Sequence, residues 1–181
     1  MFIIQGSARE GGNTELLTER LTQGIEVETV RLREYDITPI VDERHTAEGF
    51  QPVEDDMKEL VEAMLNHDTL VLATPLYWYG MSGQMKLFID RWSQCLRDHS
   101  LQFKERMQGK RVYVVIVGGP NAKVTALALV QQFKHICEFM GMTLEGYIIG
   151  RGTKPGEVLH DAEAIAAAQV LNANWRQAAD E

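Results

Sequence analysis

The sequence predicts an α/β fold, in which a five-stranded parallel sheet lies between two layers of helices in a doubly wound, three-layer sandwich. Short apolar runs alternate along the chain with longer segments of helical periodicity, and this alternation is typical of β-α-β units. The apolar runs are nearly continuous and rich in β-branched residues, which indicates strands buried on both faces. The sequence contains no internal repeat and no linker, so we expect a single domain over residues 1–181.

The first part of the chain contains two of the expected strands. Residues 2–4 form a short apolar run, and residues 27–32 (VETVRL) alternate with period two. Between them, Asn13 is a favourable N-cap for a helix that extends to about Gly24. The long irregular segment Tyr35–Pro52 follows, and its length predicts a functional lid rather than a plain connection.

The remaining helices and strands alternate along the rest of the chain. Periodic apolar residues predict helices over residues 53–66, 82–96, 124–140 and 157–174. Strands are expected at TLVLA, VYVVIV and TLEGYII, which are residues 69–73, 112–117 and 143–149. Five strands joined by helices give a parallel sheet, for which we expect the strand order 2-1-3-4-5.

Three loops of unusual composition leave the carboxyl ends of strands 1, 3 and 4. They are GSAREGGNT (residues 6–14), PLYWYGMSG (residues 75–83) and GGPNAK (residues 118–123). Ligands of doubly wound sheets bind outside these strand ends, at the point where the strand order reverses. We therefore expect the three loops to meet and to form one site.

The first loop suits a phosphate group. It ends at a helix N-terminus, where free N–H groups and the helix dipole favour an anion. Ser7, Asn13 and Thr14 add short donors, and Arg9 adds a charge-assisted donor. Because the loop has no lysine, a terminal monophosphate fits better than a triphosphate. The alternative is a tight turn with an ordinary N-cap.

The second and third loops suit a flat ring. Tyr77, Trp78 and Tyr79 lie where a polar loop would be expected, and aromatic side chains beside glycine can stack on a π-system. The alternatives are an exposed dimerisation patch and aromatic side chains that fold back into the core. The loop at residues 118–123 adds two glycines, and its alternative is an ordinary glycine-rich turn.

Composition and charge exclude several classes of partner. The net charge is −8 and no run of lysine or arginine occurs, so we expect no nucleic-acid binding. No apolar run approaches the roughly 18 residues of a membrane span, and the N-terminal residues do not resemble a leader peptide. The two cysteines are far apart, which predicts reduced thiols in a cytoplasmic protein. The five histidines lack the spacing of metal ligands, so we expect no metal.

Two stretches of the chain resemble a known family. Residues 74–92 (TPLYWYGMSGQMKLFIDRW) resemble the P-x-Y-W-x-x-M-S-G-x-x-K-x-F-I-D-R segment of the flavodoxin-fold NAD(P)H-dependent FMN reductases, and residues 6–14 are similar to their G-S-x-R-x-x-G-N-T loop. The group includes quinone reductases, azoreductases, iron–sulfur flavoproteins and tryptophan-repressor-binding-like proteins. The resemblance covers essentially the whole chain and implies a flavodoxin-like fold, FMN as cofactor and NAD(P)H as co-substrate. The compact cysteine cluster of the iron–sulfur members is missing, so we expect no such cluster.

The resemblance also assigns roles to residues of the three loops. The FMN phosphate would be held by Ser7, Arg9, Gly12, Asn13 and Thr14. The isoalloxazine ring would be lined by Pro75, Leu76, Tyr77, Trp78 and Gly80, and its other edge would be closed by Gly118, Gly119 and Asn121. The chemistry belongs to the cofactor, so we expect no catalytic acid or base among the side chains.

The implied activity is transfer of hydride from NAD(P)H to bound FMN and then to a quinone-like, azo or flavin acceptor. The alternatives are a one-electron carrier of flavodoxin type and a non-catalytic, flavin-binding redox sensor with a protein partner. Because family members are often homodimers or homotetramers with the flavin near the interface, we expect one of these states here. The helix over residues 82–96 is the candidate contact, with an ordinary core helix as its alternative.

Overall fold

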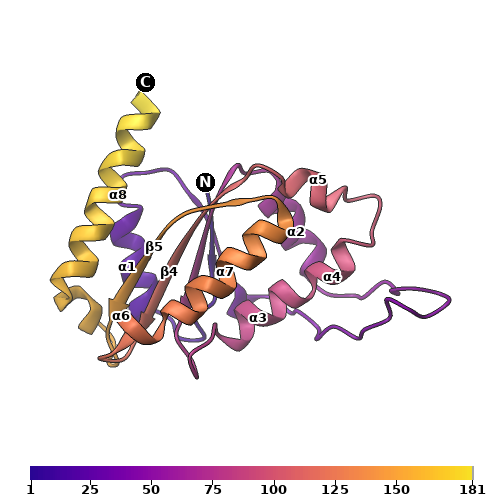
Figure 1. The fold of residues 1–181 in the computed structure, drawn as a ribbon, viewed down its shortest axis with the longest axis horizontal. Coiled ribbons are helices and arrows are strands. Elements are labelled where there is room, and N and C mark those ends of the chain that lie inside the picture. Colours follow the sequence, from indigo (N-terminus) through magenta and orange to yellow (C-terminus); the bar gives the residue numbers. More distant parts are fainter. Residues whose placement is uncertain (181) are drawn as a thin grey trace.

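The sheet of this protein has five parallel strands in the order β2-β1-β3-β4-β5, which confirms the predicted order (Figure 1). The computed structural model describes the backbone of residues 1–180 and the side-chain burial of residues 1–178. Helices cover both faces of the sheet, so the predicted three-layer sandwich is also confirmed. The strands are β1 (Phe2–Gln5), β2 (Glu28–Arg31), β3 (Thr69–Pro75), β4 (Arg111–Gly118) and β5 (Thr143–Arg151).

The central strand β3 explains the continuous apolar runs of the sequence. All seven of its residues are buried, because β3 lies between β1 and β4 and has helices on both faces. Its register with β4 runs from Thr69 opposite Arg111 to Pro75 opposite Val117. The two strands therefore end at the same edge of the sheet, and the loops that follow them leave side by side.

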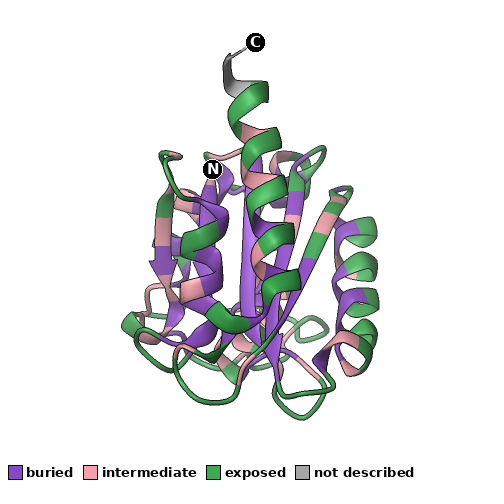
Figure 2. Ribbon diagram, turned by 90° about the vertical axis from the view of Figure 1, so that its left-hand side faces the viewer, coloured by how far each residue is buried: buried purple, intermediate pink, exposed green. Residues whose placement is uncertain are grey.

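The helices divide between the two faces of the sheet (Figure 1). The face that carries Ile3 and Val71 packs against α1 (Asn13–Leu21) and α8 (Ala162–Asp180). The opposite face packs against α2 (Met57–Leu65), α3 (Gly83–Asp90) and α7 (Leu127–Met140). Buried residues gather on the sheet and on the helix sides that face it, whereas the outer sides are exposed (Figure 2). The shorter elements are η1 (Leu32–Glu34), α4 (Trp92–Cys95), α5 (Phe103–Met107), α6 (Ala122–Thr125) and η2 (Glu157–His160).

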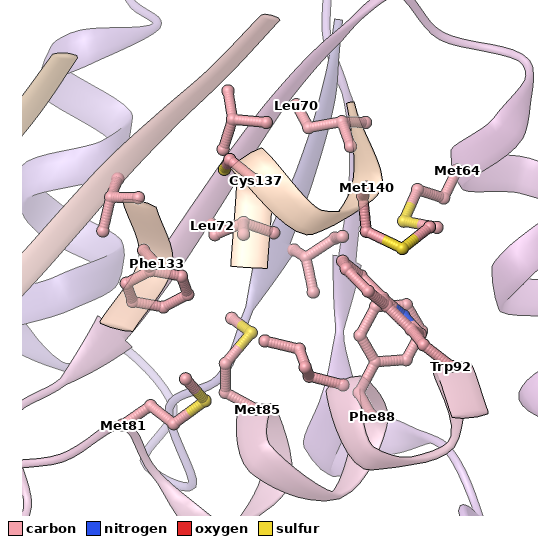
Figure 3. Packing of buried hydrophobic residues seen from close by; sticks show 14 of the residues in the cluster. Met64, Leu70, Leu72, Met81, Met85, Phe88, Trp92, Phe133, Cys137 and Met140 are labelled. Atoms are coloured by element: carbon pink, nitrogen blue, oxygen red, sulfur yellow. The ribbon is translucent and has the colours of Figure 1, made fainter. Parts of the chain in front are cut away.

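The larger hydrophobic core lies between the sheet and the layer that contains α2, α3 and α7. Leu70 and Leu72 of β3 lie in it together with Met64 of α2 (Figure 3). The ring of Phe88 in α3 packs edge to face against Trp92, with centroids 5.9 Å apart. Because α3 begins directly after the aromatic loop, this packing holds the loop's C-terminal end in place.

The helix expected over residues 82–96 begins as predicted but is divided. Ser82 is its N-cap, and the hydroxyl of Ser82 accepts a hydrogen bond from the N–H of Met85 (3.2 Å). At Arg91 the helix tightens, since the N–H of Gln94 donates to the carbonyl three residues earlier (3.0 Å). The result is two helices, α3 and α4, whose apolar residues are mostly buried, which favours the core alternative over a dimer contact.

The two ends of the long segment at residues 36–56 are tied to each other and to α3. The N–H of Thr38 donates to the carboxylate of Asp55 (3.0 Å). Arg91 forms a buried ion pair with Asp55 and also donates to the carbonyl of Thr38 (2.8 Å). Because Asp55 serves this tie, α2 begins at Met57 and not at the predicted residue 53.

Candidate functional site

The loops after β1, β3 and β4 meet at one edge of the sheet, as predicted. With the loop after β5 they enclose a depression of about 190 Å³, and a second depression of about 320 Å³ adjoins it. Leu76 and Gly119 line both depressions. The other residues of the first depression are Ser7, Arg9, Gly12, Asn13, Thr14, Pro75, Tyr77, Val117, Gly118, Gly152 and Thr153. The other residues of the second depression are Trp78, Tyr79, Pro120, Asn121, Ala122 and Thr125.

The loop after β1 is a tight turn that ends at the N-terminus of α1. The hydroxyl of Ser7 donates to the carbonyl of Arg9 (3.1 Å) and accepts a hydrogen bond from the N–H of Arg9 (3.2 Å). Gly11 has φ of +59°, a conformation that favours glycine. A Cβ at Gly12 would lie 3.2 Å from the hydroxyl oxygen of Ser7. Small residues therefore allow the turn to bring the N-terminus of α1 to the depression.

Asn13 is not the N-cap that the sequence predicts. Gly12 occupies the N-cap position, and no side chain caps this helix within the described part of the chain. The side-chain amide of Asn13 donates to the carbonyl of Lys154 (2.9 Å), and its oxygen accepts from the N–H of Val158 (3.3 Å). The side chain thus ties the segment after β5 to α1, and the first N–H groups of the helix remain free for an anion.

Arg9 is the only residue with a formal charge among the described residues that line the two depressions. Its side chain is exposed. A single cation beside a helix N-terminus gives the first depression a local preference for anions, although the net charge of the whole chain is −8.

Two charged residues that the sequence analysis missed hold the first loop. Glu15 is buried, accepts a hydrogen bond from the N–H of Gly11 (2.8 Å) and forms an ion pair with Arg33. Arg33 also donates to the carbonyls of Ser7 and Arg9, at 3.4 Å each. An acidic residue in a first helical turn is a recognisable signal, but its partner follows β2 and lies 18 residues away in sequence.

The loop after β3 is a two-residue turn between Tyr77 and Gly80, which exchange backbone hydrogen bonds of 3.0 and 2.9 Å. The two central residues, Trp78 and Tyr79, have φ of 48° and 64°. Asn and Gly are the usual residues of such a turn, so aromatic residues there indicate stored strain. Trp78 is 97% exposed and Tyr79 is 66% exposed, so these two side chains do not fold back into the core.

Glycines let the loops after β3 and β4 approach each other. A Cβ at Gly118 would lie 3.0 Å from Cβ of Leu76 and 3.1 Å from Cβ of Ala122. Gly119 has open space around it and faces both depressions. Gly80 is the one predicted site residue that lines neither depression, because its backbone closes the turn with Tyr77.

The segment after β5 completes the first depression and was missed by the sequence analysis. Gly152 and Thr153 line the depression, and the N–H of Gly152 donates to the carbonyl of Gly118 (2.8 Å). Arg151 anchors the segment through hydrogen bonds to Asp161 (2.8 to 3.2 Å). Burial raises the pKa of Asp161, but these hydrogen bonds lower it to about 2. A glycine directly after a strand was the signal that could have identified this fourth loop.

A larger cavity, of about 670 Å³, lies elsewhere, between α4 and the segment at residues 36–56. It shares no lining residue with the two depressions, and it is not at the strand ends. The segment Tyr35–Pro52, which the sequence predicts to be a lid, therefore contributes residues to the wall of this cavity and none to the strand-end site. Arg91 and Asp55, which belong to the cavity wall, are already paired with each other.

The described residues 1–180 offer neither a metal site nor a reactive thiol. No group of three or more His, Cys, Asp or Glu side chains is placed there to hold a metal ion. Cys95 and Cys137 are free, and burial raises the pKa of each thiol to about 12. The same residues include no helix that is both long and apolar enough to cross a bilayer.

Comparison with known proteins gives a consistent result. A family model described as NADPH-dependent FMN reductase matches residues 1–151. YwqN of Bacillus subtilis (strain 168), named as a NAD(P)H-dependent FMN-containing oxidoreductase, is 49% identical over 170 residues, which are 93% of this chain and 94% of that protein.

Solved structures show the same fold. The Trp repressor binding protein from Bacillus subtilis has a TM-score of 0.80 and 45% sequence identity, over 94% of this chain and 98% of that one. An FMN-dependent NADH-azoreductase from Bacillus anthracis str. Ames Ancestor, solved in complex with FMN, has a TM-score of 0.68 over 96% and 98% of the two chains. Its identity of 14% supports the fold alone. These similarities and the strand order confirm the flavodoxin-like sandwich.

Proposed function

This chain belongs to the NADPH-dependent FMN reductase family, and we propose that its two strand-end depressions hold FMN and serve electron transfer from NAD(P)H to a small acceptor of the quinone, azo or flavin type. One observation carries the proposal. A helix N-terminus with a single cation lies at one end of the paired depressions, and an exposed aromatic turn lies at the other. This arrangement fits a ligand with a phosphate at one end and a flat ring at the other.

The phosphate end is assigned to the first depression. Thr14 and the N–H groups at Gly12 and Asn13 would donate to phosphate oxygens, and Arg9 would add a charge-assisted contact. Ser7 lines the same depression, and its hydroxyl, which donates to the carbonyl of Arg9, would hold the shape of the turn around the phosphate. The side chain of Asn13 takes no part in this assignment, because it is engaged by the segment after β5.

The ring end is assigned to the loops after β3 and β4. Pro75, Leu76, Tyr77 and Trp78 would line one edge of the ring and Gly118, Gly119 and Asn121 the other, while Gly80 would act by closing the turn. Open space at Gly119 allows a flat ring to approach the backbone. Because Trp78 and Tyr79 are exposed at this end, a flat acceptor can reach and stack on the same edge.

FMN, when bound, supplies the two-electron chemistry that links NAD(P)H to the acceptor. The chain binds and orients the reactants. The N–H groups of Leu76, Tyr77 and Gly80 are engaged in backbone hydrogen bonds of 2.8 to 3.0 Å. Within the described part of the loop, this leaves the N–H groups of Trp78 and Tyr79 to donate to the polar edge of the ring.

The test is identification of the chromophore, followed by reduction. The protein is purified, its bound flavin is released and identified, and the protein is then mixed anaerobically with NADH or NADPH. We expect FMN and rapid bleaching of its absorbance with at least one of the two, faster than with free FMN. A panel of quinones, azo dyes and free flavins then ranks the acceptors by turnover. Bleaching with neither nucleotide would remove the reductase assignment and favour a one-electron carrier.

We also propose that the protein is a cytoplasmic homodimer or homotetramer. The side chains of Val124 and Leu127 on α6 and α7 are exposed and apolar, and a second copy would cover them. Light scattering coupled to size-exclusion chromatography measures the state. A charge placed on this patch by Leu127→Glu is expected to yield monomers.

A further inference from the structure

A largely buried ion pair between Glu15 and Arg33 lies against the glycine-rich loop after β1. The side chain of Glu15 is 6% exposed and that of Arg33 is 16% exposed. Removal of either partner would leave the other charge poorly solvated, so the pair acts as one unit. Arg31 also approaches Glu15, at 3.6 Å, but its side chain is 40% exposed.

The ion pair fixes the loop through backbone groups. Glu15 accepts from the N–H of Gly11, while one guanidinium nitrogen of Arg33 donates to the carbonyls of Ser7 and Arg9. These contacts bind both limbs of the turn that leads into α1. Arg33 itself is not among the residues that line the first depression, so it contacts the loop from outside the depression.

The same pair has an electrostatic role. Glu15 is in the first turn of α1, where its charge interacts favourably with the helix dipole. A phosphate dianion at this helix N-terminus would be repelled by an unpaired carboxylate. The guanidinium of Arg33 compensates the charge of Glu15, so the helix N-terminus keeps its preference for an added anion.

We propose that Arg33 and Glu15 are positioning residues that shape the loop for a phosphate monoester and compensate the charge beneath it. Arg9 is the direct cationic contact, and the ion pair acts through the loop backbone. This inference rests on the proposed function, because the loop is assigned to the FMN phosphate only there.

The test compares two flavins that differ by the phosphate alone. Dissociation constants of FMN and riboflavin are measured by fluorescence titration into the full chain freed of bound flavin, for the wild type, Arg33→Gln, Arg33→Lys and the double variant Glu15→Gln/Arg33→Gln. Arg31→Gln is the matched control, since it removes a cation that approaches the same carboxylate without touching the loop. Melting temperatures are recorded for every variant.

We expect Arg33→Gln to weaken FMN binding by about tenfold or more while riboflavin binding changes by less than about twofold. The double variant and Arg33→Lys are each expected to recover only part of the loss, because both avoid an uncompensated carboxylate but lose the contacts of the Arg33 guanidinium with the loop. Arg31→Gln should leave the ratio of the two constants unchanged.

Three results would overturn the inference. Equal losses of FMN and riboflavin affinity in Arg33→Gln would mean a general structural role. Arg33→Lys and the double variant both avoid an uncompensated buried charge. If FMN affinity is unchanged in both of them, the ion pair has no effect on phosphate binding. A wild type that binds riboflavin as tightly as FMN would instead remove the phosphate assignment of the proposed function itself.

Discussion

Replacement of the turn residues by Trp78→Asn and Tyr79→Gly is expected to raise the melting temperature and to weaken flavin binding. Both residues have positive φ, 48° and 64°, and a left-handed backbone costs a non-glycine residue roughly 1–2 kcal/mol. Asn followed by Gly is the preferred pair for a turn of this kind. The present aromatic pair therefore maintains a strained backbone while it exposes two rings.

The size of the stability gain follows from exposure and strain. Because Trp78 is 97% exposed and Tyr79 is 66% exposed, replacing these side chains removes little buried apolar surface. Relief of strain at two residues contributes about 2 kcal/mol, and the added glycine offsets about 0.5–1 kcal/mol through its unfolded-state entropy. A net gain of about 1–1.5 kcal/mol corresponds to roughly 2–6 °C in a domain of this length.

A matched pair of variants separates strain from ring contact. Trp78→Ala with Tyr79→Ala removes both rings but keeps residues that disfavour positive φ. We expect both double variants to lose flavin affinity to a similar extent, and only the Asn–Gly pair to gain stability. Calorimetry of the flavin-free chain gives the melting temperatures, and equal values for the two double variants would refute the claim that the turn stores strain.

Three further predictions concern the loops around the site. Gly152→Ala is expected to destabilise the protein by about 2–4 kcal/mol in urea unfolding, because its Cβ would lie 2.8 Å from the side-chain nitrogen of Asn13 and disturb that tie. Arg9→Glu is expected to weaken FMN binding at least about tenfold in a fluorescence titration, because it reverses the charge of the one formally charged residue among the described residues that line the first depression. Burial raises the pKa of Asp161, but hydrogen bonds from Arg151 lower it to about 2 in the folded protein, compared with about 4 in the unfolded chain. The stability that Asp161 contributes is therefore complete above about pH 4 and is lost as the pH falls through about 2. Asp161→Asn should therefore reduce the loss of unfolding free energy between about pH 4 and pH 2.

Each of these predictions has a control or a contrary outcome. Gly119→Ala is the control for Gly152→Ala, because nothing lies within 4 Å of its added Cβ, and it should leave the melting temperature unchanged. Arg20→Glu makes the same charge change in the last turn of α1 and should retain FMN affinity, so equal losses in the two arginine variants would contradict a local role of Arg9. An acid transition of the same steepness in Asp161→Asn would show that other carboxylates set it.

Sequence patterns predict the sheet and the meeting of the loops because both depend on local periodicity and on the topology of parallel strands. The continuous burial of β3 is visible in its composition, and the strand order places three unusual loops at one edge. The Ser82 cap is also a local feature, and it is present as expected.

The errors arise where side chains find partners far away in sequence. Asn13 has the chemistry of an N-cap, but its amide is engaged by residues that follow β5, more than 140 positions later. Asp55 would suit the first turn of a helix, but it pairs with Arg91 and delays the start of α2. The link between Glu15 and Arg33 depends on how α1 packs beside β2, and charge spacing alone does not reveal it.

The closed neck at Thr38, Asp55 and Arg91 fixes the two ends of the segment between residues 38 and 55 beside each other, and Gln94 of α4 makes one more tie by donating to the carbonyl of Gln51 (3.0 Å). The ends of the segment are held together by hydrogen bonds and a buried ion pair, so the distance between the ends does not depend on the number of residues between them. Doubling the length of such a closed loop costs only about 0.6 kcal/mol of closure entropy. This is the position at which the chain can accept an inserted reporter or a new recognition element while the strand-end site keeps its geometry.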